Sequence, residues 1–337
     1  MATWPVIGHE WAIDLLIRAI TGPAHTGGST DRRLSHAYLF TGPAQVGKTT
    51  LARAFAQALL CETQTGTPCG ACRACQRIAA GRYPDVQFIT AEKNTIQIDQ
   101  VRALRSDAAL SPLEGAYRIF IIREIERASP PAANALLKTL EEPPPQVILL
   151  LTSARRDQLL PTILSRCQII GLRPLPLGQI QTALETHWAV DPQRAALLAR
   201  LSSGRLGWAV NAHTDPELWP ARAKSLDDLL ALAADGYLGR LAYAETLSRQ
   251  GDAIERTLEL WATWWRDVLL VQRGLPADVV NLDRRVQLAQ QAELYRSEQV
   301  EAALNDLIQT LRRLKANVNA RLALDVLALR LPRPAVV

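Results

Sequence analysis

Residues 42–49 (GPAQVGKT) match the phosphate-binding pattern G-x-x-x-x-G-K-[ST]. In this pattern the glycines let backbone N–H groups approach phosphate oxygens, the lysine neutralises the beta and gamma phosphates, and the threonine is a ligand of Mg²⁺. The apolar run HAYLF at 36–40 predicts a buried strand before the loop, and LARAFAQALL predicts a helix after it. The predicted nucleotide contacts are Gly42, Gly47, Lys48, Thr49 and Thr50.

Four of the five cysteines fall close together and form the pattern C-x7-C-x2-C-x2-C. Four thiolates at this spacing can close a tetrahedral Zn²⁺ site that has no open position for catalysis. The alternative is that the cysteines are unligated or joined in disulfides. We expect a structural zinc site that folds an insertion with little core of its own. The predicted ligands are Cys61, Cys69, Cys72 and Cys75.

Hydrolysis of a bound nucleotide usually needs a second acidic strand end that holds Mg²⁺ and polarises the attacking water. The strand expected at 117–122 (YRIFII) is followed by Arg123 and Glu124, where a hydrolysing enzyme would have Asp and then Glu. An arginine beside Mg²⁺ would repel the metal. A neighbouring carboxylate such as Glu126 could substitute if Arg123 points elsewhere. The sequence therefore favours binding of ATP and Mg²⁺ without hydrolysis.

Strands and helices alternate in the first half of the chain. Apolar runs at 117–122 and 146–153 flank the helical pattern ANALLKTLEEPPP, in which the prolines from Pro143 onward end the helix. This alternation predicts a parallel sheet with helices on both faces. From about residue 175 onward, only helical spacing is visible.

Two boundaries divide the chain into three expected domains. Residues 22–33 are rich in Gly, Ser and Thr and predict a loop within the first domain, whereas residues 214–220 (TDPELWP) separate a short helical segment from a longer one. We expect an α/β domain at 1–172 with a zinc module at about 61–75, a small helical domain at 173–215, and an all-α domain at 216–337.

Composition limits the classes of function. The 337 residues contain 48% hydrophobic and 21% charged residues, without a long apolar run or a charged and apolar leader, so we expect a cytoplasmic protein with no membrane partner. The net charge of +5 permits an anionic partner, but no basic block indicates DNA binding by itself. Trp261, Trp264 and Trp265 fall at helical spacing, which is typical of core or interface anchors more often than of base-stacking platforms.

The order of the motifs VIGHE, RLSHAYLFTGPAQVGKTT, the four-cysteine insertion, ANALLKTLEEPP and LLPTILSRC resembles the bacterial clamp-loader AAA+ family over residues 6–170. The resemblance implies a P-loop AAA+ domain, a helical lid domain and a helical collar domain that joins subunits. It also implies a hetero-pentamer with gamma/tau ATPase subunits and a delta subunit of DNA polymerase III. Such a ring loads the sliding clamp onto primer-template DNA.

The resemblance also assigns roles to single residues. Arg166, in the SRC sequence, corresponds to a finger that stabilises phosphate charge on a neighbouring subunit's nucleotide, although an exposed arginine is more often a solvated charge. Thr152 falls on the first-sensor position. The second-sensor arginine falls at about Gly207. Its absence, together with Arg123, favours the delta-prime branch of the family, which is no ATPase on its own.

Two other interpretations remain open. An active ATPase of the gamma/tau type is favoured by the intact phosphate loop and opposed by Arg123 and by Gly207. The chain length also opposes the tau form. A zinc-containing nucleic-acid-binding protein with a vestigial nucleotide site is favoured by the basic pI of about 9.1 and the four cysteines. The absence of a basic face interleaved with aromatic residues opposes it.

Overall fold

The computed structural model describes residues 4–22, 34–251, 253–316 and 318–334. The chain forms two compact units, one of Met1–Trp188 with Ser202–Ala209 and the other of Ala189–Leu201 with Val210–Val337. Apart from Gly22, the loop predicted at 22–33 lies outside the described residues. The three-domain division expected from the sequence stays a prediction.

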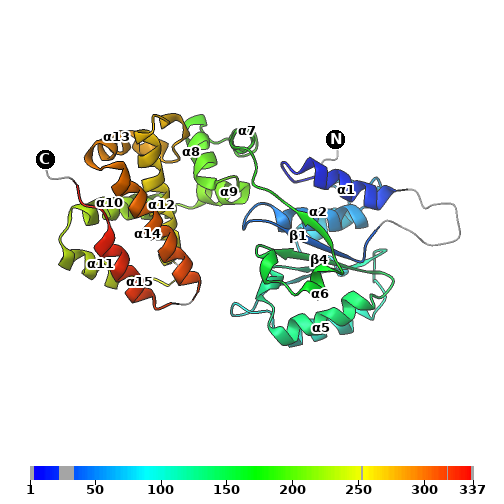
Figure 1. Ribbon diagram of the computed structural model, residues 1–337. Helices are drawn as coiled ribbons and strands as arrows, with labels where there is room; N and C mark the ends of the chain where they lie inside the picture. The colour runs from blue at the N-terminus through cyan, green and yellow to red at the C-terminus, as the bar shows by residue number, and fades with distance from the viewer. Residues whose placement is uncertain (1–3, 23–33, 252, 317, 335–337) are drawn as a thin grey trace. The chain divides into compact units, whose positions relative to one another are not determined.

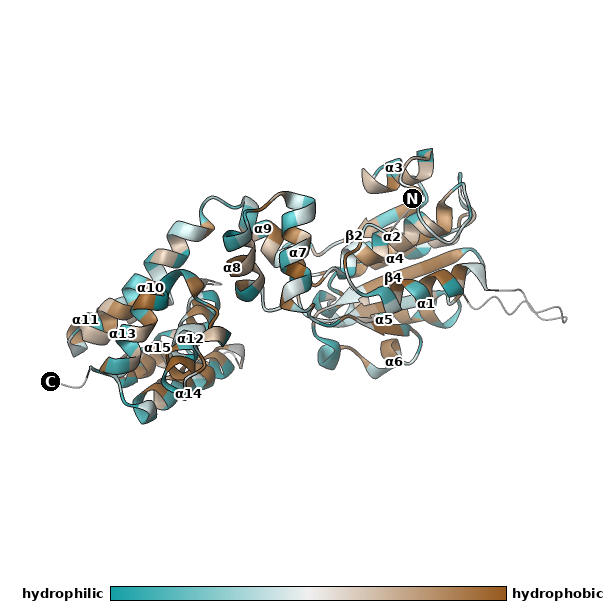
Figure 2. Ribbon diagram, turned by 90° about the horizontal axis from the view of Figure 1, so that it is seen from above, coloured by the Kyte–Doolittle hydropathy of each residue, from teal (hydrophilic) through white to brown (hydrophobic). Residues whose placement is uncertain are grey.

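A five-stranded parallel sheet with the strand order β2-β3-β4-β1-β5 forms the centre of the first unit (Figure 1). Strands β1, β3 and β4 are buried at every position, and β4 is hydrophobic along most of its length (Figure 2). Continuous burial is typical of parallel strands covered on both faces, so the predicted α/β class is confirmed. The strands are β1 (Ala37–Thr41), β2 (Val86–Ile89), β3 (Arg118–Ile122), β4 (Val147–Ser153) and β5 (Gln168–Gly171).

Helices cover both faces of the sheet because successive side chains of each strand point to opposite sides. Tyr38 and Phe40 of β1 pack in one hydrophobic core and Leu39 packs in the other. The first core is covered by α1 (Glu10–Thr21), α2 (Lys48–Leu60) and α3 (Arg73–Ala79). The second is covered by α4 (Ile98–Ala108), α5 (Pro130–Glu141) and α6 (Pro161–Leu164).

The chain after β5 contains only helices among its described residues, as the sequence predicts. None of the described helices is long and apolar enough to cross a membrane. The first unit contains α7 (Leu177–Trp188) and the start of α9 (Leu206–Thr214), and the second contains most of α8 (Pro192–Ser202). The other helices of the second unit are α10 (Leu218–Ala234), α11 (Tyr237–Ser248), α12 (Ala253–Gln272), α13 (Arg285–Leu294), α14 (Ser297–Lys315) and α15 (Ala320–Arg330).

The core of the second unit is centred on α12. Trp264 and Trp265 are fully buried and Trp261 is only 2% exposed, which confirms the prediction that these side chains belong to a core. The indole N–H of Trp261 donates to the carbonyl oxygen of Ser225 in α10 at 2.9 Å. This bond satisfies the polar end of a side chain whose body is apolar.

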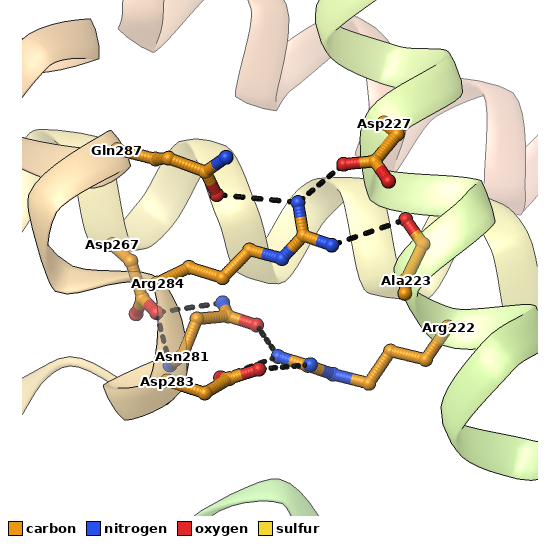
Figure 3. Close-up of polar contacts among 8 residues, drawn as sticks. All are labelled: Arg222, Ala223, Asp227, Asp267, Asn281, Asp283, Arg284 and Gln287. Carbon is orange, nitrogen blue, oxygen red and sulfur yellow. Dashed lines mark hydrogen bonds and ion pairs between the residues drawn. The ribbon is translucent and has the colours of Figure 1, made fainter.

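A buried polar network ties the segment between α12 and α13 to α10 (Figure 3). Arg222 donates to the Asp283 carboxylate at 2.6 Å and to the Asn281 amide oxygen. Asp267, which is fully buried, accepts bonds from the backbone and side-chain nitrogens of Asn281, both at 2.8 Å. Arg284 donates to the neighbouring α10 helix as well. The network fixes an irregular segment that also packs Val279 into the core of the second unit.

Arg240 of α11 is fully buried, and among the described residues its hydrogen-bond acceptors are all backbone carbonyls. These carbonyls lie at or beyond the C-terminal ends of α10 and α15, where carbonyl groups have no partner within the helix and the helix dipole is negative. Burial lowers the pKa of Arg240, but an arginine stays protonated in proteins. The acceptors are Ala233, Asp235, Ala328, Leu331 and Pro332.

Candidate functional site

The phosphate loop lies between β1 and α2, in the context predicted from the sequence. Gly42 and Gly47 have φ values of 136° and 109°, a region that other residues rarely adopt. A Cβ atom on Gly42 would stand 2.3 Å from the carbonyl oxygen of Leu172, so only glycine fits there. Because α2 begins at Lys48, its first N–H groups lie next to the loop.

Lys48 is nearly buried, and its Nζ donates to the carbonyl oxygens of Gly42 at 2.7 Å and Pro43 at 2.6 Å. Burial lowers its pKa, and the negative charges of Glu126 and Glu124 oppose that shift. The ammonium group of Lys48 is therefore bound to carbonyls of its own loop, so a phosphate group would have to compete with these two carbonyls for its N–H donors. At the start of α2, Thr49 is half-buried and Thr50 is exposed.

Arg123 and Glu124 directly follow β3, at the positions where a hydrolysing enzyme would have Asp and then Glu. Arg123 is exposed, whereas Glu124 has a φ of 52° and pairs with Arg127 at 2.9 Å. The backbone N–H of Glu124 donates to the Thr152 hydroxyl at 3.1 Å. Thr152 lies buried on β4, so this bond ties the predicted first-sensor position to the end of β3.

Glu126 is one of two carboxylates whose negative charge acts on Lys48 of the phosphate loop. One of its oxygens accepts the backbone N–H of Ala154 at 2.8 Å, and the other is buried without a partner among the described residues. Its charge acts on Lys48 more strongly than that of Glu124. Acidic groups are thus present beside the loop although Arg123 occupies the position where an aspartate is expected.

Two contacts hold the outer turn of the phosphate loop. The backbone N–H of Gly207, in the first turn of α9, donates to the Gln45 carbonyl at 3.0 Å, and Nε2 of His9 lies 3.3 Å from the Val46 carbonyl. A Cβ atom on Gly207 would stand 2.7 Å from the Gln45 oxygen, so a side chain there would force helix and loop apart. The position predicted to correspond to the second sensor therefore supplies a backbone contact, for which no local pattern in the sequence provides a signal.

The four clustered cysteines bring their sulfur atoms within 4.8 Å of one another, so they could hold a metal ion. Cys61 and Cys72, and likewise Cys69 and Cys75, are 4.0 Å apart at sulfur. Sulfur atoms bound to tetrahedral zinc at about 2.3 Å lie ~3.8 Å apart, whereas a disulfide needs about 2.05 Å. The arrangement fits four ligands around one ion and excludes disulfides in this state.

Backbone and side-chain contacts support the cysteine cluster. The N–H groups of Cys69, Cys72 and Cys75 donate to the preceding cysteine sulfur at 3.4, 3.2 and 3.4 Å. Burial raises the pKa of Cys61, but hydrogen bonds from Thr63 and Cys69 bring it down to about 6. Gln57 of α2 donates to the Cys75 carbonyl at 2.8 Å, which ties the module to the helix that follows the phosphate loop.

Arg166 follows α6, and its side chain is 33% exposed. Its guanidinium pairs with Glu141 of α5 at 2.8 Å and donates to the Thr162 carbonyl and the Ser165 hydroxyl. None of these partners belongs to the phosphate loop. Glu141 was not predicted from the sequence, although it lies within the quoted ANALLKTLEEPP motif. Cys167, beside the arginine, packs against the second core, and burial raises its pKa to about 12.

Family models and sequence relatives agree with this architecture. The model "DNA polymerase III, delta subunit" matches residues 27–176, and "DNA polymerase III, delta subunit, C terminal" matches residues 216–332. The DNA polymerase III subunit delta' of Bacillus subtilis is 30% identical over 302 residues, which are 89% of this chain and 91% of that one. Subunit tau of Escherichia coli K12 is 42% identical over 52% of this chain, which spans only 28% of tau.

One similar solved structure is a DNA polymerase III gamma subunit-related protein of Thermotoga maritima, with a TM-score of 0.43 and 18% identity. The match covers 94% of this chain and 98% of that one. The RuvB branch-migration motor of Thermotoga maritima has a TM-score of 0.40 and 17% identity, over 86% of this chain and 89% of that one. Family membership rests on the sequence relatives. Because the 30% identity to the Bacillus delta' subunit extends over 89% of the residues, the chain belongs to the DNA polymerase III delta' family.

Proposed function

We propose that this chain acts as a delta-prime-type subunit of a DNA polymerase III clamp loader in the cytoplasm. The observation that carries the proposal is the match to the Bacillus delta' subunit along 89% of the chain. Its partners would be gamma/tau-type ATPase subunits and a delta subunit in a hetero-pentamer. The complex would place the sliding clamp on primer-template DNA, with the helical domain at 216–337 as collar and that at 173–215 as lid.

In this proposal the phosphate loop binds ATP with Mg²⁺ without hydrolysing it. The N–H groups around Gly42 and Gly47 would hold phosphate oxygens, Lys48 would neutralise them, and Thr49 would bind the metal. Three observations support weak turnover: Arg123 at the end of β3, the lysine bound to its own loop, and the backbone contact at Gly207 in place of a charged sensor. Thr152 would keep the first-sensor position.

Arg166 is proposed as the finger supplied to the nucleotide of a neighbouring ATPase subunit. Its support is a partly exposed guanidinium held at the surface, with no partner in its own phosphate loop among the described residues. A planar, permanently charged group is suited to stabilise phosphate charge in trans. Whether the neighbouring subunit holds ATP or its product would thereby determine whether Arg166 has a gamma phosphate to contact.

The cluster of Cys61, Cys69, Cys72 and Cys75 is proposed to bind structural Zn²⁺. A set of four thiolates leaves no open coordination position, so the ion would stabilise the module between α2 and β2 and take no part in catalysis. The bond from Gln57 to Cys75 would carry that stabilisation to α2.

ATP turnover by the purified chain, alone and then with its clamp-loader partners on primed DNA, tests the proposal. We expect no turnover by the chain alone and a large loss of the complex's turnover with Arg166→Ala, since arginine fingers contribute roughly 10³-fold or more. Arg249→Ala, at an exposed salt bridge of the second unit, is the matched control. Unchanged turnover with Arg166→Ala would remove this residue from the role.

An active ATPase is the second candidate, because the carboxylates of Glu124 and Glu126 act on Lys48. The same assay separates the two. Robust turnover by the isolated chain, abolished by Lys48→Ala and by Glu126→Gln, would establish the ATPase and exclude the non-hydrolysing subunit.

A further inference from the structure

The last residue of α5 carries a charge that its place in the helix disfavours. The helix ends at Glu141, just before Glu142 and a run of prolines that begins at Pro143. A helix C-terminus carries partial negative charge, so a carboxylate is unfavourable there. Glu141 pairs with Arg166 at 2.8 Å, whereas Glu142 forms no ion pair among the described residues. The ion pair compensates for the unfavourable position of Glu141.

The guanidinium of Arg166 is held at both of its terminal nitrogens. Nη2 forms an ion pair with the Glu141 carboxylate at 2.8 Å, and Nη1 donates to the Thr162 carbonyl at 3.0 Å and to the Ser165 hydroxyl at 3.2 Å. An arginine has five N–H donors, so two of them remain without a partner among the described residues. The side chain is therefore oriented and still able to donate to an incoming phosphate.

We propose that Glu141 is a positioning residue for Arg166: its carboxylate holds the guanidinium in the orientation in which it meets the nucleotide of the neighbouring subunit. The inference rests on the proposed function of Arg166. A free arginine side chain samples many rotamers, and an anchored one loses less freedom when it binds phosphate.

The exposure of the Arg166–Glu141 ion pair determines how much the loss of Glu141 should lower the turnover of ATP. The side chains of Arg166 and Glu141 are 33% and 47% exposed, so the pair is an ordinary surface ion pair. Such pairs contribute about 1 kcal/mol or less, which corresponds to about fivefold in a rate. A contact of this strength can orient the arginine without preventing phosphate from replacing the carboxylate. Loss of Glu141 should therefore cost far less than loss of Arg166.

Turnover of ATP by the reconstituted clamp-loader complex on primed DNA tests the inference. We expect Glu141→Ala in this chain to lower kcat about two- to fivefold with an unchanged KM for ATP. Glu141→Gln, which keeps an acceptor oxygen, should recover much of the loss. Glu142→Ala removes the adjacent carboxylate, which pairs with no described cation, and should leave kcat unchanged.

A double-mutant cycle distinguishes positioning from a general effect on the fold. In an Arg166→Ala background, Glu141→Ala should change kcat no further. An equal loss with and without Arg166, or identical turnover of Glu141→Ala and Glu142→Ala, would overturn the inference while the role of Arg166 stands. If Arg166→Ala itself leaves turnover unchanged, the proposed finger fails and the positioning role fails with it.

Discussion

Replacement of Arg240 by methionine should destabilise the second unit severely. The substitution keeps a long side chain in the core but removes the guanidinium N–H groups, which donate to the carbonyls of Ala233, Asp235, Ala328, Leu331 and Pro332. Because the guanidinium is fully buried, water does not reach it in the folded chain. The two helix ends that it joins would lose their shared donor.

The magnitude follows from the cost of buried acceptors that lose their donor. Each such acceptor costs about 1–3 kcal/mol, and the costs are not additive because the carbonyls share one donor group. Removal of one partner from a buried charged cluster costs about 3–5 kcal/mol. We therefore expect the free energy of unfolding of the second unit to fall by about 3–5 kcal/mol, which lowers its Tm by roughly 10 °C or more.

Urea unfolding followed by tryptophan fluorescence measures the effect, because Trp261, Trp264 and Trp265 lie in the core of the second unit. The control is Arg249→Met at the opposite end of the same helix, where the side chain is 76% exposed and bridges to Glu245. The control should change the free energy of unfolding by less than about 0.5 kcal/mol. A loss below about 1 kcal/mol for Arg240→Met would refute the argument, since the carbonyls would then find other partners.

Three more predictions concern the first unit. Burial lowers the pKa of His9 below its ordinary value of 6.5, so as the pH falls the unfolded chain binds a proton before the folded chain does. The free energy of unfolding should therefore decrease as the pH falls below 6.5. His9→Gln should weaken this pH dependence, as measured by urea unfolding between pH 7.5 and about 5.5. Gly207→Ala should push Gln45 away and raise hydrogen exchange in the phosphate loop, whereas Gly178→Ala, where no atom stands within 4 Å of the new Cβ, should not. Chelation of zinc, or Cys69→Ser, should release about one metal ion per chain and raise proteolysis within 61–79, with Cys167→Ser as an unaffected control.

The sequence predicts those elements whose local pattern is strong. Strands β1, β3 and β4 begin and end within about one residue of the expected runs, because buried parallel strands are apolar at every position. By contrast, β2 has four residues of which the middle two are half-buried, and α4 buries only Val101, Leu104 and Ala108. A signal for α4 was present in Gln97 and Gln100, which form a capping box.

Contacts between residues far apart in the chain leave no local pattern. Arg222 meets Asn281 and Asp283 across about sixty positions, and Arg240 meets carbonyls beyond α15. As isolated residues in a sequence, these arginines resemble exposed charges. The pairing of Arg166 with Glu141 was missed for the same reason, although both residues lie in quoted motifs.

The close approach of Gly207 to the phosphate loop limits how this position can change during evolution. A change from glycine to any larger residue, a charged one included, would place a Cβ atom 2.7 Å from the Gln45 oxygen and distort the loop. A second change that lets α9 retreat would have to come with it or before it. A charged side chain at position 207 thus requires at least two coordinated changes, and any single substitution there is expected to be unfavourable.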